Sequence, residues 1–404
     1  EQLCELNILR TIFSQDDASF PKLPITSDDT SLEVSFSHRI ETVPTLLKIQ
    51  DGIEVDRTVG WSQEIWKAFL DIEDLGSENI RSYSPGCGSL SVDPDLQGML
   101  QKKYGSGLVS REVTFASAED EFEAMYDRGW SDGLPLIPPT IERVQAMLEG
   151  TSRKPDDIVA LVPPDLVGLT VEKIAINAVM AGCKPEYLPV VITALETACS
   201  DEFNMHGLLA TTMPVGPVFF VNGPIRKSIN MNSGMNLLGQ GNRANSTIGR
   251  AVQLTVRNVG GGRPGEVDRA THGSPAKYGL CFAEDEEGSP WQSYAQDQGF
   301  SLEQYTVTLF PGEGPRMIVD QLSRSPDELA RSLAMGIIGN VHPKLVMGFD
   351  AILIIGPEHA SRFVEAGWTK EQVNEEIINH SIRDTDELIR GADGIAEGLP
   401  EVFA

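Results

Sequence analysis

Residues 216–224 have the sequence GPVFFVNGP, an apolar run bounded on both sides by glycine and proline. A run of this length between turn residues predicts a buried strand that leads into a turn. The flanking segments have helical patterns. Residues 168–199 predict two apolar helices broken at 182–185, and residues 247–262 mix helix and strand signals. Residues 344–377 predict a strand, a turn and a helix. Strands that alternate with helices indicate an α/β domain with a substantial sheet.

Length and composition favour a globular protein of more than one domain. The chain has 404 residues, of which 41% are hydrophobic and 23% are charged. We place the boundaries at 1–75, 76–116 and 117–404, where the middle segment is a linker or loop rich in Ser, Pro and Gly. No apolar run approaches the roughly 20 residues of a membrane helix, and no signal-peptide pattern begins the sequence. We therefore expect a cytoplasmic protein with no membrane partner.

Charge and cysteine content exclude further classes. The net charge of −27 repels phosphate backbones, so nucleic acid is not an expected partner. The five cysteines are odd in number, widely spaced and without a C-x-x-C pair, which argues against a disulfide scaffold and a zinc ribbon. Free thiols in a reducing compartment are the expectation.

The first 75 residues hold a hairpin signal. In residues 41–61, two short strand-like runs are joined by Asp51-Gly52, and the helical pattern SQEIWKAFLDI follows. The order Val-Pro-Thr, two antiparallel strands and a closing helix resembles the C-terminal part of a thioredoxin fold, in which the proline is cis. This resemblance implies an incomplete thioredoxin-like module over residues 1–75. It places Cys4 where the second cysteine of the active dithiol belongs, with Glu1 in place of the first.

The segment 76–116 contains Cys87 between two glycines. A thiol with no crowding side chains next to it is a candidate exposed redox thiol, and a cysteine that merely lies in a loop is the alternative. We therefore take Cys4 and Cys87 as candidate redox residues.

An asparagine-rich segment, residues 222–250, is a candidate for binding an anionic substrate. Asparagine offers donors and acceptors without charge, glycine allows close approach of the backbone, and arginine clamps carboxylate or phosphate. The alternative is a polar loop with structural Asx turns. The candidate substrate-binding residues, with Arg263 and His206 from neighbouring polar settings, are Asn232, Asn236, Asn242, Arg243, Asn245, Arg263 and His206.

Residues 258–291 hold a dense group of reactive side chains. Cys281 follows an apolar run and precedes four acidic residues, and His272 lies in a flexible Thr-His-Gly setting suited to a general base. Lys277, four residues before Cys281, is placed to stabilise a thiolate on a helix. Glu284 is a candidate proton donor. Cys183, at the break between the two helices, is a second candidate catalytic thiol.

Three interpretations of Cys281 stay open: a buried core residue, a nucleophile or redox thiol, and a metal ligand. No H-x-x-x-H or C-x-x-C motif supports a metal, so the metal ligands and the cofactor are unknown at this stage. The thiol interpretation requires the sulfur to open into a polar cavity shared with the asparagine-rich segment.

Long motifs across residues 117–404 resemble a poorly characterised bacterial family. They include FNMHGLLATT, NSGMNLLGQGNRANSTIGRA and IIGPEHASRFVEAGWTK. Members of that family accompany small selenoproteins with a Sec-Gly-Ser-Cys motif. The resemblance implies a thiol or selenol redox partner, and CGSL at residues 87–90 is similar to the partner's motif.

These patterns favour a thiol-dependent enzyme, an oxidoreductase or lyase that acts on a small anionic molecule and forms a homo-oligomer. The alternative is a hydrolase or lyase of a small polar substrate that uses water or a metal, with a purely structural first module. A third hypothesis is a non-catalytic subunit of a selenoprotein complex.

Overall fold

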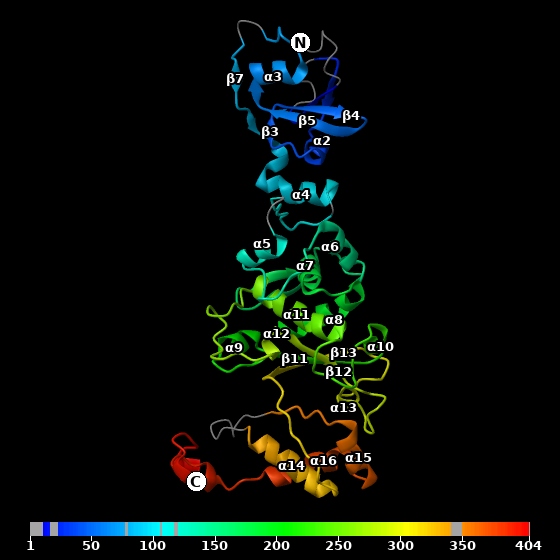
Figure 1. The fold of residues 1–404 in the computed structure, drawn as a ribbon, viewed down its shortest axis with the longest axis vertical. Helices are drawn as coiled ribbons and strands as arrows, with labels where there is room; N and C mark the ends of the chain where they lie inside the picture. Colours follow the sequence, from blue (N-terminus) through cyan, green and yellow to red (C-terminus); the bar gives the residue numbers. More distant parts are fainter. Residues whose placement is uncertain are drawn as a thin grey trace. The chain divides into compact units, whose positions relative to one another are not determined.

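A computed structural model describes residues 11–16, 23–76, 80–105, 107–116, 120–340 and 350–403. The chain divides into two compact units, residues 1–116 and 117–404. Both units contain helices and strands, so the protein is of mixed α/β composition (Figure 1). Among the described residues, no helix has the length and apolar character needed to cross a membrane.

The first unit contains short strands and three α-helices among its described residues. In chain order these elements are β1 (Ile12–Ser14), β2 (Thr26–Asp28), α2 (Glu33–Ser37), β3 (Thr42–Val43), β4 (Thr45–Gln50), β5 (Ile53–Val59), β6 (Trp61–Ser62), α3 (Gln63–Leu70), β7 (Tyr83–Ser84), β8 (Cys87–Gly88), the 3-10 helix η1 (Leu90–Val92) and α4 (Pro94–Tyr104).

The expected hairpin is confirmed. Strands β4 and β5 are antiparallel, and the two turn residues Asp51 and Gly52 both have positive φ, 52° and 79°. Positive φ at both turn positions matches the right-handed twist of the strands, which explains why Asp-Gly is favoured there. Helix α3 begins after Ser62, whose side chain makes no capping hydrogen bond.

The thioredoxin-like order is present only in part. The Val43–Pro44 peptide bond is cis, and β4, β5 and α3 follow it in the expected order. The described strands of this unit, however, pair as separate two-stranded sheets, β1 with β2, β3 with β8, β4 with β5 and β6 with β7. A single thioredoxin-like sheet is not formed by these residues, and Cys4 lies outside the described residues.

The expected linker is largely structured. Residues 83–104 form β7, β8, η1 and α4 within the first unit. Asp93 caps α4 by accepting a hydrogen bond from the backbone N–H of Asp95, and Leu100 on this helix is fully buried. A capped helix with a buried leucine is part of a folded unit, so these residues extend the first unit beyond residue 75.

The second unit is larger and more helical. Its elements are α5 (Glu121–Asp127), α6 (Ile141–Leu148), β9 (Ile158–Val162), β10 (Val167–Thr170), α7 (Val171–Ala181), η2 (Pro185–Tyr187), α8 (Leu188–Ala198), α9 (Met205–Ala210), β11 (Gly216–Asn222), α10 (Ile225–Ser228), α11 (Arg243–Asn258), α12 (Ala276–Gly279), β12 (Leu280–Ala283), α13 (Tyr294–Asp297), β13 (Thr306–Gly312), α14 (Pro326–Ile338), α15 (Pro357–Glu365), α16 (Lys370–Ser381), α17 (Thr385–Leu388), η4 (Ala392–Gly394) and η5 (Glu401–Phe403).

The predicted buried strand is confirmed as β11, the centre of a three-stranded sheet ordered β12-β11-β13. Every residue of β11 is buried. Strand β12 runs parallel to it and β13 antiparallel. The prediction of a substantial sheet is not met, because three strands are the most that any described sheet contains. Helices supply most of the core instead: α7, α8 and α11 pack against one another beside this sheet (Figure 1).

Close backbone contact joins α11 to the entry of β12. A Cβ atom added at Gly249 on α11 would lie 2.9 Å from the carbonyl carbon of Gly279, which itself has φ of 123°. Only glycine permits this approach and this backbone conformation. The contact seats α11 against the strand that contains Cys281.

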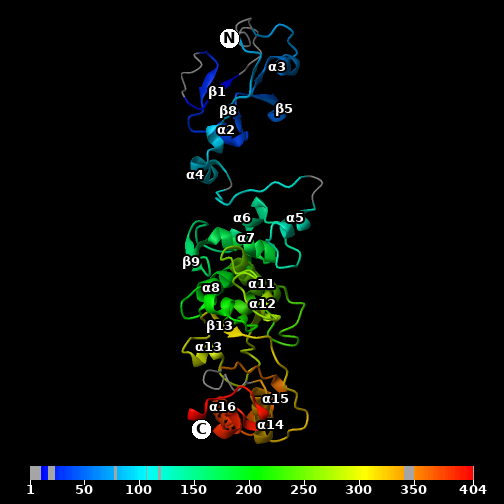
Figure 2. The same cartoon turned by 90° about the vertical axis from the view of Figure 1, so that its left-hand side faces the viewer.

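The last helices form a separate hydrophobic cluster. Helices α14, α15 and α16 lie side by side (Figure 2), and their buried residues are Leu329, Ala330, Leu333, Ala334, Phe363, Val373 and Ile377. The strand predicted within 344–355 is not formed at residues 350–355, which have no regular structure. Residues 341–349 lie outside the described residues.

Candidate functional site

Cys281 lies in the core and not in a polar cavity. It pairs with Phe219 across β11 and β12, and its side chain is 4% exposed. Burial, with a smaller contribution from the nearby Cys183, raises the pKa of the Cys281 thiol well above its ordinary value. A thiol with a raised pKa stays protonated and is a poor nucleophile. The required polar cavity is therefore absent around this sulfur, and the core interpretation of Cys281 fits best.

Cys183 is buried in the same region. Its Sγ donates a hydrogen bond to the backbone oxygen of Thr247, 3.3 Å away, and burial raises the pKa of the thiol to about 12. Cys183 is thus also protonated near neutral pH, because the nearby Arg243 and Arg250 lower its pKa by less than burial raises it.

Lys277 is not placed to stabilise a Cys281 thiolate, and His272 is not placed to act as its general base. The Lys277 ammonium forms an ion pair with Asp268, with Nζ 2.9 and 3.0 Å from the two carboxylate oxygens. Lys277 lies on the short helix α12 and Cys281 on the following strand, so the helical i, i+4 relation does not apply. His272 lies on an exposed loop.

The acidic run after Cys281 has a structural role. Strands β11 and β12 are parallel, so the residues that follow them meet at one edge of the sheet. There Asn222 Nδ2 donates to the carboxylates of Glu284 and Glu286, at 2.7 and 2.8 Å. The backbone N–H of Tyr294 also donates to Glu284, at 3.0 Å. Glu284 therefore acts as an acceptor that fixes the loop, which argues against the expected role as a proton donor.

The buried side chain of Arg226 binds the acidic residues at this end of the sheet. We call the resulting group of hydrogen-bonded residues the Arg226 network. Its members are Asn222, Arg226, Glu284, Glu286 and Glu287. Arg226 is 3% exposed and donates to the carboxylates of Glu286 and Glu287 and to the backbone oxygen of Glu284. Hydrogen bonds from Lys227 and Arg226 lower the pKa of Glu287 to about 2. Arg226 and Lys227 thus pair with two of the four carboxylates, those of Glu286 and Glu287. Glu284 is held by neutral donors, and the acidic run as a whole fixes the end of the sheet.

The asparagine-rich segment also folds on itself. Asn242 caps α11 by accepting from the N–H of Asn245, and Asn245 is 4% exposed. Asn245 bonds both backbone groups of Asn232, and Asn236 donates to the oxygen of Gln240. These are local turns and caps, so the expected ligand clamp is not formed by these four asparagines.

Arg243 and His206 have other surroundings. Nε of Arg243 donates to the backbone oxygen of Gly182, at 2.8 Å, and thereby caps the end of α7. His206 is exposed on α9.

Arg263 stands apart from the other predicted binding residues. Its Nε is buried and has no hydrogen-bond partner among the described residues, and the same holds for Nε of Arg257. No carboxylate within 4.0 Å pairs with either guanidinium in that part of the chain, although the chain has an excess of 27 acidic charges. Buried donors without acceptors are uncommon in folded proteins and often mark a ligand position.

Asn258 lies next to this arginine. Its Nδ2 donates to the backbone oxygen of Trp130 and to Oδ1 of Asn177, both at 3.0 Å, whereas its Oδ1 is buried without a partner. A Cβ added at Gly129 would lie 3.9 Å from Nη1 of Arg263. Asn258 and Arg263 therefore both lie against the Gly129–Trp130 backbone. We call Asn258, Arg263 and the Gly129–Trp130 backbone the Arg263 site.

Helix geometry and glycines create the Arg263 site. Helix α11 ends at Asn258, and the chain then turns through three glycines before Arg263. A Cβ added at Gly260 would come within 2.3 Å of the backbone oxygen of Pro163, so only glycine allows the turn to fold this tightly. Sequence reasoning identified Arg263 but gave no role to Arg257, Asn177 or Asn258; the signal was an arginine on each side of a glycine run at the end of a helix.

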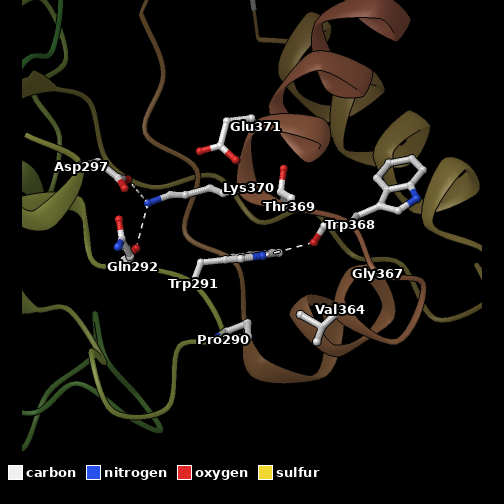
Figure 3. Close-up of a pocket in the computed structure, with 10 residues that line it drawn as sticks. All are labelled: Pro290, Trp291, Gln292, Asp297, Val364, Gly367, Trp368, Thr369, Lys370 and Glu371. Atoms are coloured by element: carbon white, nitrogen blue, oxygen red, sulfur yellow. Dashed lines mark hydrogen bonds and ion pairs between the residues drawn. The ribbon is translucent and has the colours of Figure 1, made fainter.

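A separate cavity of about 410 Å³ lies between the segment 290–297 and the start of α16 (Figure 3). The Trp291 ring lies at its centre, and its Nε1 donates to the backbone oxygen of Trp368. The Lys370 ammonium donates to Asp297 and to the backbone oxygen of Gln292. These bonds tie the two walls together, and the carboxylates balance the one lysine, so this cavity is less suited to an anion than the Arg263 site.

Comparison with protein-family models, curated proteins and solved structures found no match to the chain.

Proposed function

We propose that the larger unit binds a small anionic molecule at the Arg263 site. The observation that supports this most directly is the buried Nε of Arg263, which has no acceptor among the described residues. The Arg263 residue as a whole is half-buried, and an anion bound there would supply the acceptor that its buried Nε lacks. Planar guanidinium groups bind carboxylate or phosphate through paired hydrogen bonds.

The site also favours a ligand that carries a hydrogen-bond donor. Oδ1 of Asn258 is a buried acceptor with no donor. A ligand that offers both an anion and an O–H or N–H group would satisfy Arg263 and Asn258 together. The proposed class is therefore a small hydroxy- or amino-carboxylate, or a phosphate monoester with a free hydroxyl. As an enzyme, the protein would use this site to hold its substrate.

A second candidate function is thiol chemistry in the first unit. Cys87 is exposed, and it pairs with Val43, the residue before cis-Pro44. An exposed thiol on the strand that pairs with β3, directly before β4, β5 and α3, supports the proposed thioredoxin-like module and a thiol or selenol partner. Cys281 and Cys183 are excluded from this proposal by their burial.

Ligand-dependent thermal stabilisation tests the anion proposal. Unfolding of the full chain is followed by calorimetry with L-malate, succinate and inorganic phosphate, at constant ionic strength set with NaCl. At a ligand concentration 100 times Kd, a single site adds about 2.7 kcal/mol to the free energy of unfolding. We expect stabilisation by malate to exceed that by succinate, which lacks the hydroxyl group that Asn258 would accept.

Matched variants separate binding at this site from a general ion effect. Arg263→Gln should abolish the stabilisation, whereas Arg316→Gln should retain it, because the Arg316 side chain is 66% exposed and makes only a 3.7 Å contact with Glu313. The proposal fails if NaCl alone stabilises as well as malate, or if both variants respond equally.

A further inference from the structure

We propose that Asp327, Glu376 and His380 form a binding site for a divalent transition-metal ion between α14 and α16. One imidazole nitrogen and two carboxylate oxygens lie within 4.8 Å of one another at this position. The proposal does not depend on the anion site, which involves other residues of the same unit.

Two packed helices bring the three side chains together. Asp327 lies in the first turn of α14, and Glu376 and His380 lie in the second half of α16. The start of α14 is therefore beside the end of α16, so the helices are antiparallel neighbours. Glu376 and His380 are four residues apart and share one face of the helix. The hydrophobic cluster that includes Leu329 and Ile377 holds the two helices in contact.

The starts of α14 and α16 are each fixed by local hydrogen bonds. Ser325 and Glu328 form a capping box at the start of α14, and Thr369 and Gln372 form one at the start of α16. These reciprocal hydrogen bonds set where each helix begins. The positions of the three ligand side chains are thus determined by the packing of the helices and not by a loop.

The distances suit a small metal ion. His380 Nε2 is 2.9 Å from Oδ1 of Asp327 and 3.9 Å from Oε2 of Glu376. In a tetrahedral site with bonds of about 2.1 Å, neighbouring ligand atoms are roughly 3.4 Å apart. To reach that spacing, the His380–Asp327 distance would lengthen and the His380–Glu376 distance would shorten, each by about half an ångström, through small side-chain rotations. Metal binding would then replace the His380–Asp327 hydrogen bond.

The donor set determines the class of metal. A neutral imidazole binds through Nε2 while Nδ1 keeps its proton, and nitrogen with two carboxylates suits Zn²⁺, Co²⁺ or Ni²⁺ better than Mg²⁺. The two helix dipoles oppose each other here, because the positive end of α14 lies at Asp327 and the negative end of α16 at His380. The two carboxylates therefore supply the attraction for a cation. Asp327 is 64% exposed, so a fourth position would remain open to water. Three protein ligands with one open position is also the arrangement of zinc sites that activate water.

Titration of the full chain with metal tests the proposal. The protein is first treated with EDTA and dialysed, and then titrated with ZnCl₂ by calorimetry and with CoCl₂ by visible absorption. We expect one equivalent to bind, a cobalt absorption band in the visible range that Zn²⁺ removes, and no comparable binding of MgCl₂. His380→Gln should lower the affinity at least about tenfold and remove the cobalt band.

Two further variants make the result decisive. Glu376→Gln should weaken zinc binding as His380→Gln does, which guards against a folding defect in one variant. Glu375→Gln removes the same charge from an exposed neighbouring position and should leave binding unchanged. The proposal is overturned if the wild-type protein binds no Zn²⁺ when ZnCl₂ is present at about 100 µM, a concentration on the order of the Kd of a surface site. It is also overturned if His380→Gln binds Zn²⁺ like the wild type, or if Glu375→Gln weakens binding as much as His380→Gln does.

Discussion

Replacing Arg226 by methionine should destabilise the larger unit strongly. Arg226 is 3% exposed and donates to the backbone oxygens of Gly223 and Glu284 and to the carboxylates of Glu286 and Glu287. Methionine keeps much of the hydrocarbon volume but none of these donors. The variant therefore removes the charge from the Arg226 network with a small change in packing.

The expected loss follows from the burial of its partner. The Glu286 side chain is 8% exposed and would keep only the hydrogen bonds from Asn222 Nδ2 and the Gly223 N–H, each 2.8 Å long. Removal of one member of a buried ion pair costs about 3–5 kcal/mol, because the other charge stays buried. For a unit of this size, a loss of about 3 kcal/mol corresponds to a fall in Tm of roughly 6–12 °C.

Urea denaturation followed by circular dichroism measures this loss. Lys227→Met is the matched control, because Lys227 is adjacent, 67% exposed and bonded to the half-exposed Glu287. A surface ion pair of that kind contributes at most about 1 kcal/mol. Equal losses of unfolding free energy in the two variants would show that the Arg226 network does not hold the sheet edge, and the reasoning would be refuted.

Three more outcomes are expected. The pKa of Glu287 is lowered from 4.5 to about 2, so its ionised form stabilises the fold above about pH 4.5 and this contribution is lost as the pH falls toward 2; Glu287→Gln should reduce the slope of stability against pH in that window. In a Cys4→Ser background, one thiol should react rapidly with a disulfide reagent in the native protein, and Cys87→Ser should remove that reaction. The half-buried Cys199, whose pKa is raised by burial to about 11, should react slowly, and the buried Cys183 and Cys281 only on unfolding. Gly249→Ala should lower the free energy of unfolding by about 1–3 kcal/mol in a denaturant titration, because the added methyl group would press on the backbone of Gly279; an unchanged midpoint would contradict the described contact.

Local signals in the sequence were sufficient for several elements. The apolar run at 216–222 is strand β11, and Asp51-Gly52 is the turn of a hairpin. Each depends on chemistry within a few residues, such as positive φ at a glycine. The coarse α/β composition follows from these elements.

The surroundings of the candidate site residues depend on contacts between distant parts of the chain, which the sequence alone does not predict. The charges after Cys281 suggested a reactive thiol, but two of these carboxylates are bound by Arg226, which lies about 60 residues earlier in the chain. A sequence pattern does not reveal a contact between residues so far apart. Alternation along β12 turns Cys281 toward the helices, whereas Phe282 joins the cluster on the opposite face. Arg250, close to the predicted site, is bound by Asp132 at 2.7 Å, across a long stretch of sequence. Arg263 remained without such a partner, and no local pattern could have separated the two arginines.

The order of strands in the central sheet also bears on how the chain folds as it is synthesised. Strand β11 emerges first, but its neighbours come later: Phe219 pairs with Cys281 in β12 and with Leu309 in β13. At roughly 5–20 residues per second, the ribosome takes on the order of 3–12 s to make the about 60 residues that separate β11 from β12. During that interval a largely apolar segment lacks both of its partner strands, and nascent-chain chaperones are the agents suited to shield it.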